Sequence, residues 1–242
     1  MGSNYNLLVI DMARAVHYHL SYLNAVSRTE SVAESCFRQP AIEYIERHPQ
    51  LGYSVFLEHR HPIYKYRRID LSWAKGNTDT PSSFMEMKYV KVETAGEPEQ
   101  QRYYNDLLRL ASVLANNKES KCYFLASGQI LNWEQCFINA YTPDESNKKI
   151  AETGTEKREP NKLMVKSVYN NWFSFDNNNP VKEVVISNDI TRYKEFQKDY
   201  KKRTDVPKKN LKRFTTHLLW LSGNDPTNLS DNTMTAIWEI VV

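Results

Sequence analysis

The feature that most constrains the fold is a run of three strand-like segments with a helical segment on either side. Residues 53–60, 64–73 and 83–90 are rich in β-branched and aromatic side chains, and turn residues separate them. Residues 99–116 then carry apolar side chains at helical spacing, and residues 121–126 have the apolar character of a buried strand. This order predicts a mixed α/β fold.

Helices are also expected ahead of the first strand. Residues 7–25 repeat apolar side chains every three to four positions, starting from Leu7. A second helix is expected to end near Phe37, and Pro40 suits the first turn of a third. Beyond residue 128 we expect a short helix at 132–140, a loop at 144–160, strands at 163–169, 172–175 and 184–187, a charged helix at 190–203, and closing strands at 214–222 and 234–242.

Composition narrows the class of protein. A chain of 242 residues suits one large domain, or a domain with an extension. Its three cysteines form no CxxC pair, which argues against a disulfide framework or a structural zinc site. No apolar run reaches the roughly 18 residues expected of a membrane span. We therefore expect a soluble cytoplasmic protein with no membrane partner.

Two neighbouring strands carry the residues that point to chemistry. Glu86 and Lys88 are two apart in the strand 83–90, so they project from the same face, and a hairpin brings Asp70 alongside them. Two carboxylates and an ammonium group among apolar neighbours are costly unless a cation or a substrate compensates them. Oxygen ligands at this spacing suit Mg²⁺ or Mn²⁺, with the Met87 carbonyl as a further ligand.

The triplet Glu-x-Lys is common by chance, and the chain offers internal comparisons. Glu119-Ser-Lys121 spans a junction between elements, and Asp199-Tyr-Lys201 lies in an expected helix, where side chains two apart diverge. Only the triplet that begins at Glu86 lies inside an apolar strand with an aspartate on the preceding strand. The alternative is a surface Glu-Lys pair with Asp70 at a strand edge, which would be nearly neutral in energy.

With these residues in place, the first half of the chain resembles the PD-(D/E)xK phosphodiesterase superfamily, the restriction-endonuclease-like nucleases. The superfamily pattern is a helix with a Glu, a strand, a strand with Asp, a strand with Glu-x-Lys, a helix and a strand. The match runs from about residue 31 to 128 in the same order. One departure is Ile69, which stands where the superfamily motif has its proline.

The resemblance implies an α/β fold with a restriction-endonuclease-like core, in which helices flank a mixed central sheet, and a β-rich C-terminal extension. The expected division is an N-terminal helix at 1–30, the nuclease-like core at 31–128 and an α+β extension at 129–242 that belongs to the same compact unit. The resemblance also implies that Asp70 and Glu86 bind Mg²⁺ or Mn²⁺, with the Met87 carbonyl, and that Lys88 orients or deprotonates the attacking water.

Other residues are candidates for accessory roles. Glu34 is slightly favoured over Glu43 as the helical carboxylate of the resemblance, and Glu58 is a third candidate. Gln100 and Tyr104 share a helix face and resemble an extension that some exonuclease-like members place beside the lysine. On the same helix, Asp106 and Arg109 are three apart, which predicts an ion pair on the helix surface.

A basic segment in the second half predicts a nucleic-acid contact. Residues 192–213 hold ten Lys or Arg against three acidic residues, with aromatic side chains between them. Basic groups bind phosphates and aromatic rings stack on bases. The alternative is a solvated helix and loop. The expected contacts are Lys198, Lys201, Lys202, Arg203, Lys208, Lys209, Lys212 and Arg213.

The sequence and the resemblance together predict a metal-dependent nuclease that hydrolyses phosphodiester bonds. The expected partner is nucleic acid, with DNA favoured over RNA, and a homodimer or a partner subunit stays open. Relatives of this kind act in restriction, repair or defence against phage, and nothing in the sequence selects among these. Two alternatives remain: a catalytically silent member that binds nucleic acid, and an interaction protein that docks a partner through Trp133, Trp172, Trp220 and Trp238.

Overall fold

A computed structural model describes most of the 242-residue chain. It covers residues 3–26, 34–90, 97–133, 137, 139–143, 162–166, 168–186, 211–222 and 233–242. The helices are α1 (Ser3–Ala25), α2 (Glu34–Glu46), α3 (Glu97–Asn116) and α4 (Ile130–Trp133), with short 3₁₀ helices η2 (Pro49–Leu51) and η5 (Val168–Asn171). The strands are β1 (Tyr53–Arg60), β2 (Arg68–Lys75), β3 (Ser83–Val90), β4 (Lys121–Gln129), β5 (Asn139–Pro143), β6 (Lys162–Lys166), β7 (Val181–Val185), β8 (Arg213–Leu221) and β9 (Thr233–Val241).

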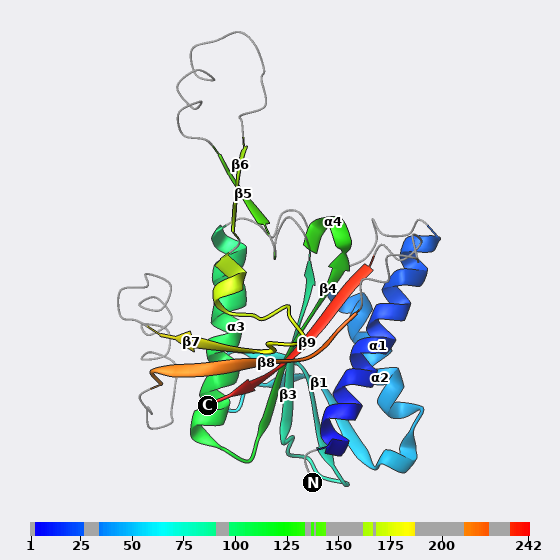
Figure 1. Cartoon of the computed structure of the whole chain (residues 1–242). Helices are drawn as coiled ribbons and strands as arrows, with labels where there is room; N and C mark the ends of the chain where they lie inside the picture. Colours follow the sequence, from blue (N-terminus) through cyan, green and yellow to red (C-terminus); the bar gives the residue numbers. More distant parts are fainter. Residues whose placement is uncertain are drawn as a thin grey trace.

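Seven strands form one mixed sheet in the order β1-β2-β3-β4-β9-β8-β7 (Figure 1). β3 and β4 are parallel, and every other neighbouring pair in this sheet is antiparallel. The parallel pair requires a crossover connection, and α3 provides it. β5 and β6 form a separate two-stranded ribbon that projects from the body. The predicted α/β class, with helices flanking a mixed sheet, is therefore confirmed.

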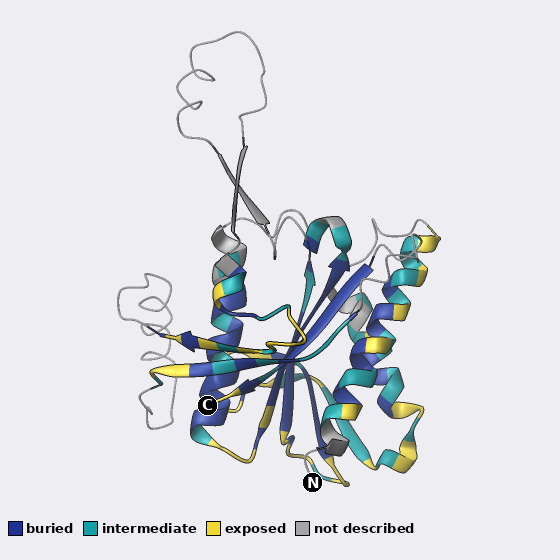
Figure 2. Ribbon diagram, viewed as in Figure 1, coloured by how far each residue is buried: buried dark blue, intermediate teal, exposed yellow. Residues whose placement is uncertain are grey.

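The helices cover the two faces of the sheet. α1 and α2 pack on one face and α3 packs on the other (Figure 1). Residues 169–175 join α3 on its face. Burial follows this layering, because the central strands are buried along most of their length while the exposed residues lie on the outer surfaces of the helices, the edge strands and the loops (Figure 2). None of the described helices combines the length and apolarity that a membrane span needs.

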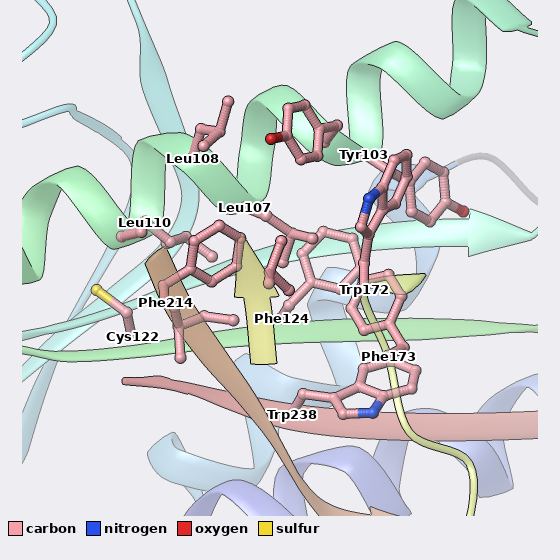
Figure 3. Packing of buried hydrophobic residues seen from close by; sticks show 14 of the residues in the cluster. Tyr103, Leu107, Leu108, Leu110, Cys122, Phe124, Trp172, Phe173, Phe214 and Trp238 are labelled. Atoms are coloured by element: carbon pink, nitrogen blue, oxygen red, sulfur yellow. The ribbon is translucent and has the colours of Figure 1, made fainter. Parts of the chain in front are cut away.

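The core on the α3 face is aromatic. Tyr103 on α3 contacts Phe124 on β4, with ring centroids 5.5 Å apart, and Phe173 lies 4.4 Å from Trp238 on β9 (Figure 3). Such pairs contribute roughly 0.5–1.5 kcal/mol each beyond the area they bury. Three of the tryptophans considered for partner docking, Trp133, Trp172 and Trp238, are buried in this core.

Several predicted elements agree closely with the structure. The strand expected at 83–90 is β3, and the helix expected at 99–116 is α3, which begins two residues earlier. β4 extends past Gly128 to Gln129, so our prediction that the strand ends at 126 was too short. Gly128 is compatible with the strand because its backbone packs closely on Val90.

Other predicted elements were wrong. The two short helices expected around Pro40 are one helix, α2, with Pro40 in its interior. The second strand begins at Arg68, not at Tyr64. Residues 172–175 form no strand, and Asn139 and Ala140 lie in β5, not in a helix. Leu7 is 55% exposed, because the buried stripe of α1 is formed by Leu8, Val9, Met12, Ala13, Val16 and Leu20. The loop expected at 144–160 and the helix expected at 190–203 lie outside the described residues.

Candidate active site

The site is located where β2 and β3 stop pairing. The last pair of the ladder is Leu71 with Met85, and Asp70 is the next residue on β2. Asp70 Oδ2 accepts a hydrogen bond from the backbone N–H of Met87 at 2.8 Å. The N–H and C=O of a strand residue point to the same edge, so the Met87 carbonyl faces the same gap. The predicted convergence of Asp70 on the Glu86–Lys88 strand is confirmed.

Glu86 and Lys88 project together toward α3, as their spacing predicts. Lys88 Nζ lies 3.1 Å from Asp106 Oδ2. Arg109 also pairs with Asp106, and its Nη2 lies 3.9 Å from Glu86 Oε1. Asp106 is only 2% exposed, so the expectation of a surface pair between Asp106 and Arg109 was wrong. The pair instead lies against the sheet and contacts both members of the triplet.

Glu86 is the most perturbed group of the site. Its side chain is 4% exposed, and its Oε1 atom has no hydrogen-bond partner among the described residues. Burial raises the pKa of the Glu86 carboxyl well above its ordinary value, and the charge of Asp70 and a hydrogen bond with it act in the same direction. The opposing charges of Arg109 and Lys88 contribute less than burial and the charge of Asp70, and the hydrogen bond contributes least. Burial therefore favours the protonated form of Glu86, and its Oε1 atom is buried without a hydrogen bond among the described residues.

Arg38 on α2 holds the other side of the site. Its Nη2 lies 2.8 Å from Asp70 Oδ1, and its Nη1 pairs with Glu58. The pairs Leu57–Leu71 and His59–Ile69 place Glu58 opposite Asp70 across the β1–β2 ladder. Glu58 has φ of 47°, in the left-handed region that glutamate rarely adopts. The backbone is thus strained where a carboxylate meets Arg38.

These groups form a continuous chain of contacts, which we call the charged chain. Its charges nearly balance, because four carboxyl groups face three cations and burial favours the neutral form of one of the four, Glu86. Such balance matters because an unpaired buried charge costs several kcal/mol. The members of the charged chain, in order of contact, are Glu58, Arg38, Asp70, Glu86, Arg109, Asp106 and Lys88.

His61 lies next to Arg109. Its Nδ1 accepts hydrogen bonds from the backbone N–H groups of Ile63 and Tyr64, both at 3.1 Å. Burial, together with the charge of Arg109, lowers the pKa of His61 to about 3. Burial also lowers the pKa of Arg109, and the nearby Glu86 opposes this effect. His61 is therefore a neutral neighbour of the charged chain.

The oxygen atoms of this site match, in part, the ligands that a hard divalent cation prefers. Asp70 and Glu86 supply two carboxylates that touch each other, the Glu86 oxygen without a partner is available, and the Met87 carbonyl faces the same gap. Among the described residues no three His, Cys, Asp or Glu side chains are grouped closely enough to hold a metal ion. Glu34 begins α2, but its side chain lies outside the described residues, so its role stays a prediction.

The remaining candidates are distributed over the fold. Glu43 pairs with Arg47 and accepts a hydrogen bond from Gln39 on the surface of α2. Tyr104 is buried against Trp172, with ring centroids 5.0 Å apart, so it is part of the core. Gln100 is half-buried on α3, and an accessory role for it stays a prediction.

Most of the basic segment lies outside the described residues, including Lys198, Lys201, Lys202, Arg203, Lys208 and Lys209. Lys212 and Arg213 are described, and both are exposed. Arg213 lies 3.2 Å from Glu183 on the neighbouring strand β7, an exposed pair of little energetic weight. The nucleic-acid contact stays a prediction.

Sequence reasoning gave Arg38 no role, and it predicted the pair of Asp106 and Arg109 but placed it on the surface, not in the charged chain. A signal existed for the last two, because they interrupt an otherwise apolar run that includes Leu107, Leu108 and Leu110. A charged pair within such a run is a candidate for burial against charged partners.

No family model, curated protein or solved structure matches this chain. Its function is therefore inferred from the residues and geometry of the site.

Proposed function

We propose that this protein is a Mg²⁺- or Mn²⁺-dependent nuclease that hydrolyses phosphodiester bonds, with DNA favoured as substrate. The observation that carries the proposal is the contact between Asp70 and the buried Glu86, whose Oε1 has no hydrogen-bond partner among the described residues, with Lys88 on the same strand face. A carboxyl pair in which one buried oxygen has no hydrogen-bond partner destabilises the fold unless that oxygen binds a ligand.

The order of elements supports the proposal. α2, β1, β2 with Asp70, β3 with the Glu86–Lys88 triplet, α3 and β4 follow one another as in the superfamily that the sequence resembles. This likeness of order adds weight to the resemblance, and the chemistry of the site is a separate support.

Asp70 and Glu86 would hold the metal, with the Met87 carbonyl as a further oxygen. A bound divalent cation supplies a water of lowered pKa and neutralises phosphate charge. Lys88, an ammonium ion held by Asp106, donates hydrogen bonds and is placed to orient the attacking water or the phosphate. In hydrolysis the water oxygen would bond to phosphorus and give up a proton, the bond to the leaving sugar oxygen would break, and that oxygen would take up a proton.

The charge of the site suits an anionic substrate. When Glu86 is ionised and a divalent cation is bound, the charged chain and the cation together carry one net positive charge. A phosphodiester carries one negative charge, so it complements the loaded site.

The test is a cleavage assay with purified full-length protein. Plasmid, linear duplex DNA, single-stranded DNA and RNA are each incubated with Mg²⁺, Mn²⁺ or EDTA. We expect cleavage of at least one substrate with metal and none with EDTA. Asp70→Asn, Glu86→Gln and Lys88→Met should each lower the rate by about 100-fold or more.

Asp79→Asn and Lys75→Met serve as matched controls, because both residues are exposed and lie outside the charged chain. They should cleave at the wild-type rate. Cleavage that survives EDTA, or equal rates in all five variants, would contradict the assignment of the site.

A second candidate is a silent nucleic-acid-binding protein. One observation favours it: Asp70 and Lys88 both have internal partners, Arg38 and Asp106. In that case no condition yields cleavage, while binding to DNA weakens steeply with salt.

A further inference from the structure

Arg38 forms an ion pair with an Asp70 oxygen that the proposed metal would bind. Asp70 has two carboxylate oxygens: Oδ2 accepts the Met87 N–H at 2.8 Å, and Oδ1 lies 2.8 Å from Arg38 Nη2. Its side chain is 13% exposed, which leaves little open approach. A cation that binds Asp70 through Oδ1 therefore approaches the oxygen that the guanidinium already contacts.

A second ion pair holds the Arg38 side chain in place. Its other terminal nitrogen pairs with Glu58, whose backbone adopts φ of 47°. Strain of this kind persists only where other interactions compensate for it. Arg38 is 19% exposed, so its charge is screened less than that of a surface residue. Glu34, the helical carboxylate candidate, is four residues earlier on α2, so both positions share one helix face.

We propose that the Arg38 guanidinium and a divalent cation are alternative occupants of the Asp70 carboxylate, so that Arg38 sets the metal affinity of the site. This inference rests on the metal site of the proposed function. The reasoning is electrostatic: two cations that share one carboxylate repel each other, and an internal cation tethered to α2 is always at high effective concentration. Removing Arg38 takes away the cation that competes for Asp70 Oδ1.

The experiment is a calorimetric titration of full-length protein with MnCl₂. Wild type should bind Mn²⁺, and Arg38→Gln should bind it at least about tenfold more tightly, because the competing cation is gone. Arg38→Lys keeps a positive charge on the same helix and should stay within about threefold of wild type. Arg47→Gln is the matched control: Arg47 directly follows the same helix, pairs with Glu43, and its replacement should leave the affinity unchanged.

Equal or weaker Mn²⁺ binding by a folded Arg38→Gln variant would overturn the inference while leaving the proposed function intact. Absence of binding in wild type and in every variant would instead overturn the metal site itself, and the inference with it.

A second measurement needs no variant. In ¹⁵N-arginine NMR spectra of wild type, saturating Mg²⁺ should shift the Arg38 side-chain resonance and speed exchange of its guanidinium protons, with Arg47 unchanged. An Arg38 resonance that does not respond to Mg²⁺, in protein shown to bind it, would contradict displacement.

Discussion

At the scale of single residues, the site is defined by charges that are buried together. Asp106 shows this most clearly, because one nearly inaccessible carboxylate pairs with both Lys88 and Arg109. Buried pairs contribute little net stability when intact, but removal of one partner leaves an uncompensated charge. A single substitution in the charged chain should therefore lower the free energy of unfolding by more than the number of its ion pairs would indicate.

Asp106→Asn should destabilise the protein by about 3 kcal/mol, because two cations lose their shared anion. Guanidinium denaturation measures the change. Glu183→Gln, which breaks the exposed pair with Arg213, should cost less than about 1 kcal/mol. If both variants lose the same small amount of stability, Asp106 is not the buried anion described above.

His61 gives a pH prediction. Its pKa is about 3 in the folded protein against an ordinary value of 6.5, so between these values the unfolded chain binds a proton that the folded protein does not. Stability should therefore fall as pH drops through this window, by about 1.4 kcal/mol per pH unit from this group alone.

His61→Asn keeps an acceptor for the Ile63 and Tyr64 N–H groups and should remove that contribution to the slope. Urea denaturation at several pH values between 3.5 and 6.5 measures it. His59→Asn is the comparison: burial lowers the pKa of His59, but His59 is only half-buried whereas His61 is buried, so the slope should change less. If the free energy of unfolding depends on pH in the same way in His61→Asn and in wild type, the prediction is contradicted.

At the scale of elements, the close packing of β4 on β3 fixes the position of β3, the strand that carries Glu86 and Lys88. A Cβ added at Gly128 would lie 2.5 Å from the carbonyl oxygen of Val90, so the parallel strands approach too closely there for any side chain. Gly128→Ala should cost about 1–3 kcal/mol and raise amide hydrogen exchange at the carboxyl end of β3.

Gly76→Ala is the control for that substitution. The added methyl group has open space, so its cost comes from the left-handed backbone at φ of 87°. Exchange in β3 and β4 should then stay at wild-type rates. Unchanged amide hydrogen exchange near Val90 in Gly128→Ala would show that β3 and β4 can move apart there without loss of their hydrogen bonds.

Elements with strong local patterns were predictable from sequence. Residues 85–89 alternate apolar and charged side chains, and the stripe of Tyr103, Leu107, Leu110 and Leu114 on α3 is buried as its spacing predicts. Asp70, Glu86 and Lys88 were found because strand periodicity and a hairpin are local rules. The role of Arg38 was not predictable, because its contacts with Glu58 and Asp70 span 20 and 32 residues and depend on tertiary packing.

At the scale of the whole molecule, the two halves of the sequence share one sheet. β9 lies beside β4, and Ile237 on β9 belongs to the same core as α1 and α2. Nothing local in the second half indicates this pairing, which joins residues more than 100 positions apart. The expected boundary near residue 128 therefore falls within β4, at the end that pairs with β9.

A fragment of residues 31–128 should consequently fail to fold alone. It would expose the β4 edge and lose both α1 and β9, so apolar residues such as Tyr123 and Leu125 would face water. Circular dichroism and NMR dispersion of the purified fragment, compared with the full chain, measure the outcome. A cooperative thermal transition in the fragment would contradict the single shared core.

Anomalous diffraction from a crystal soaked in MnCl₂ tests most directly whether Asp70 and Glu86 share one divalent cation. We predict an anomalous peak within about 2.0–2.4 Å of oxygens from both carboxylates, with Arg38 withdrawn from Asp70. A fully soaked crystal without a peak between Asp70 and Glu86, or with Mn²⁺ bound only elsewhere, would contradict the proposed metal site and the nuclease mechanism that depends on it.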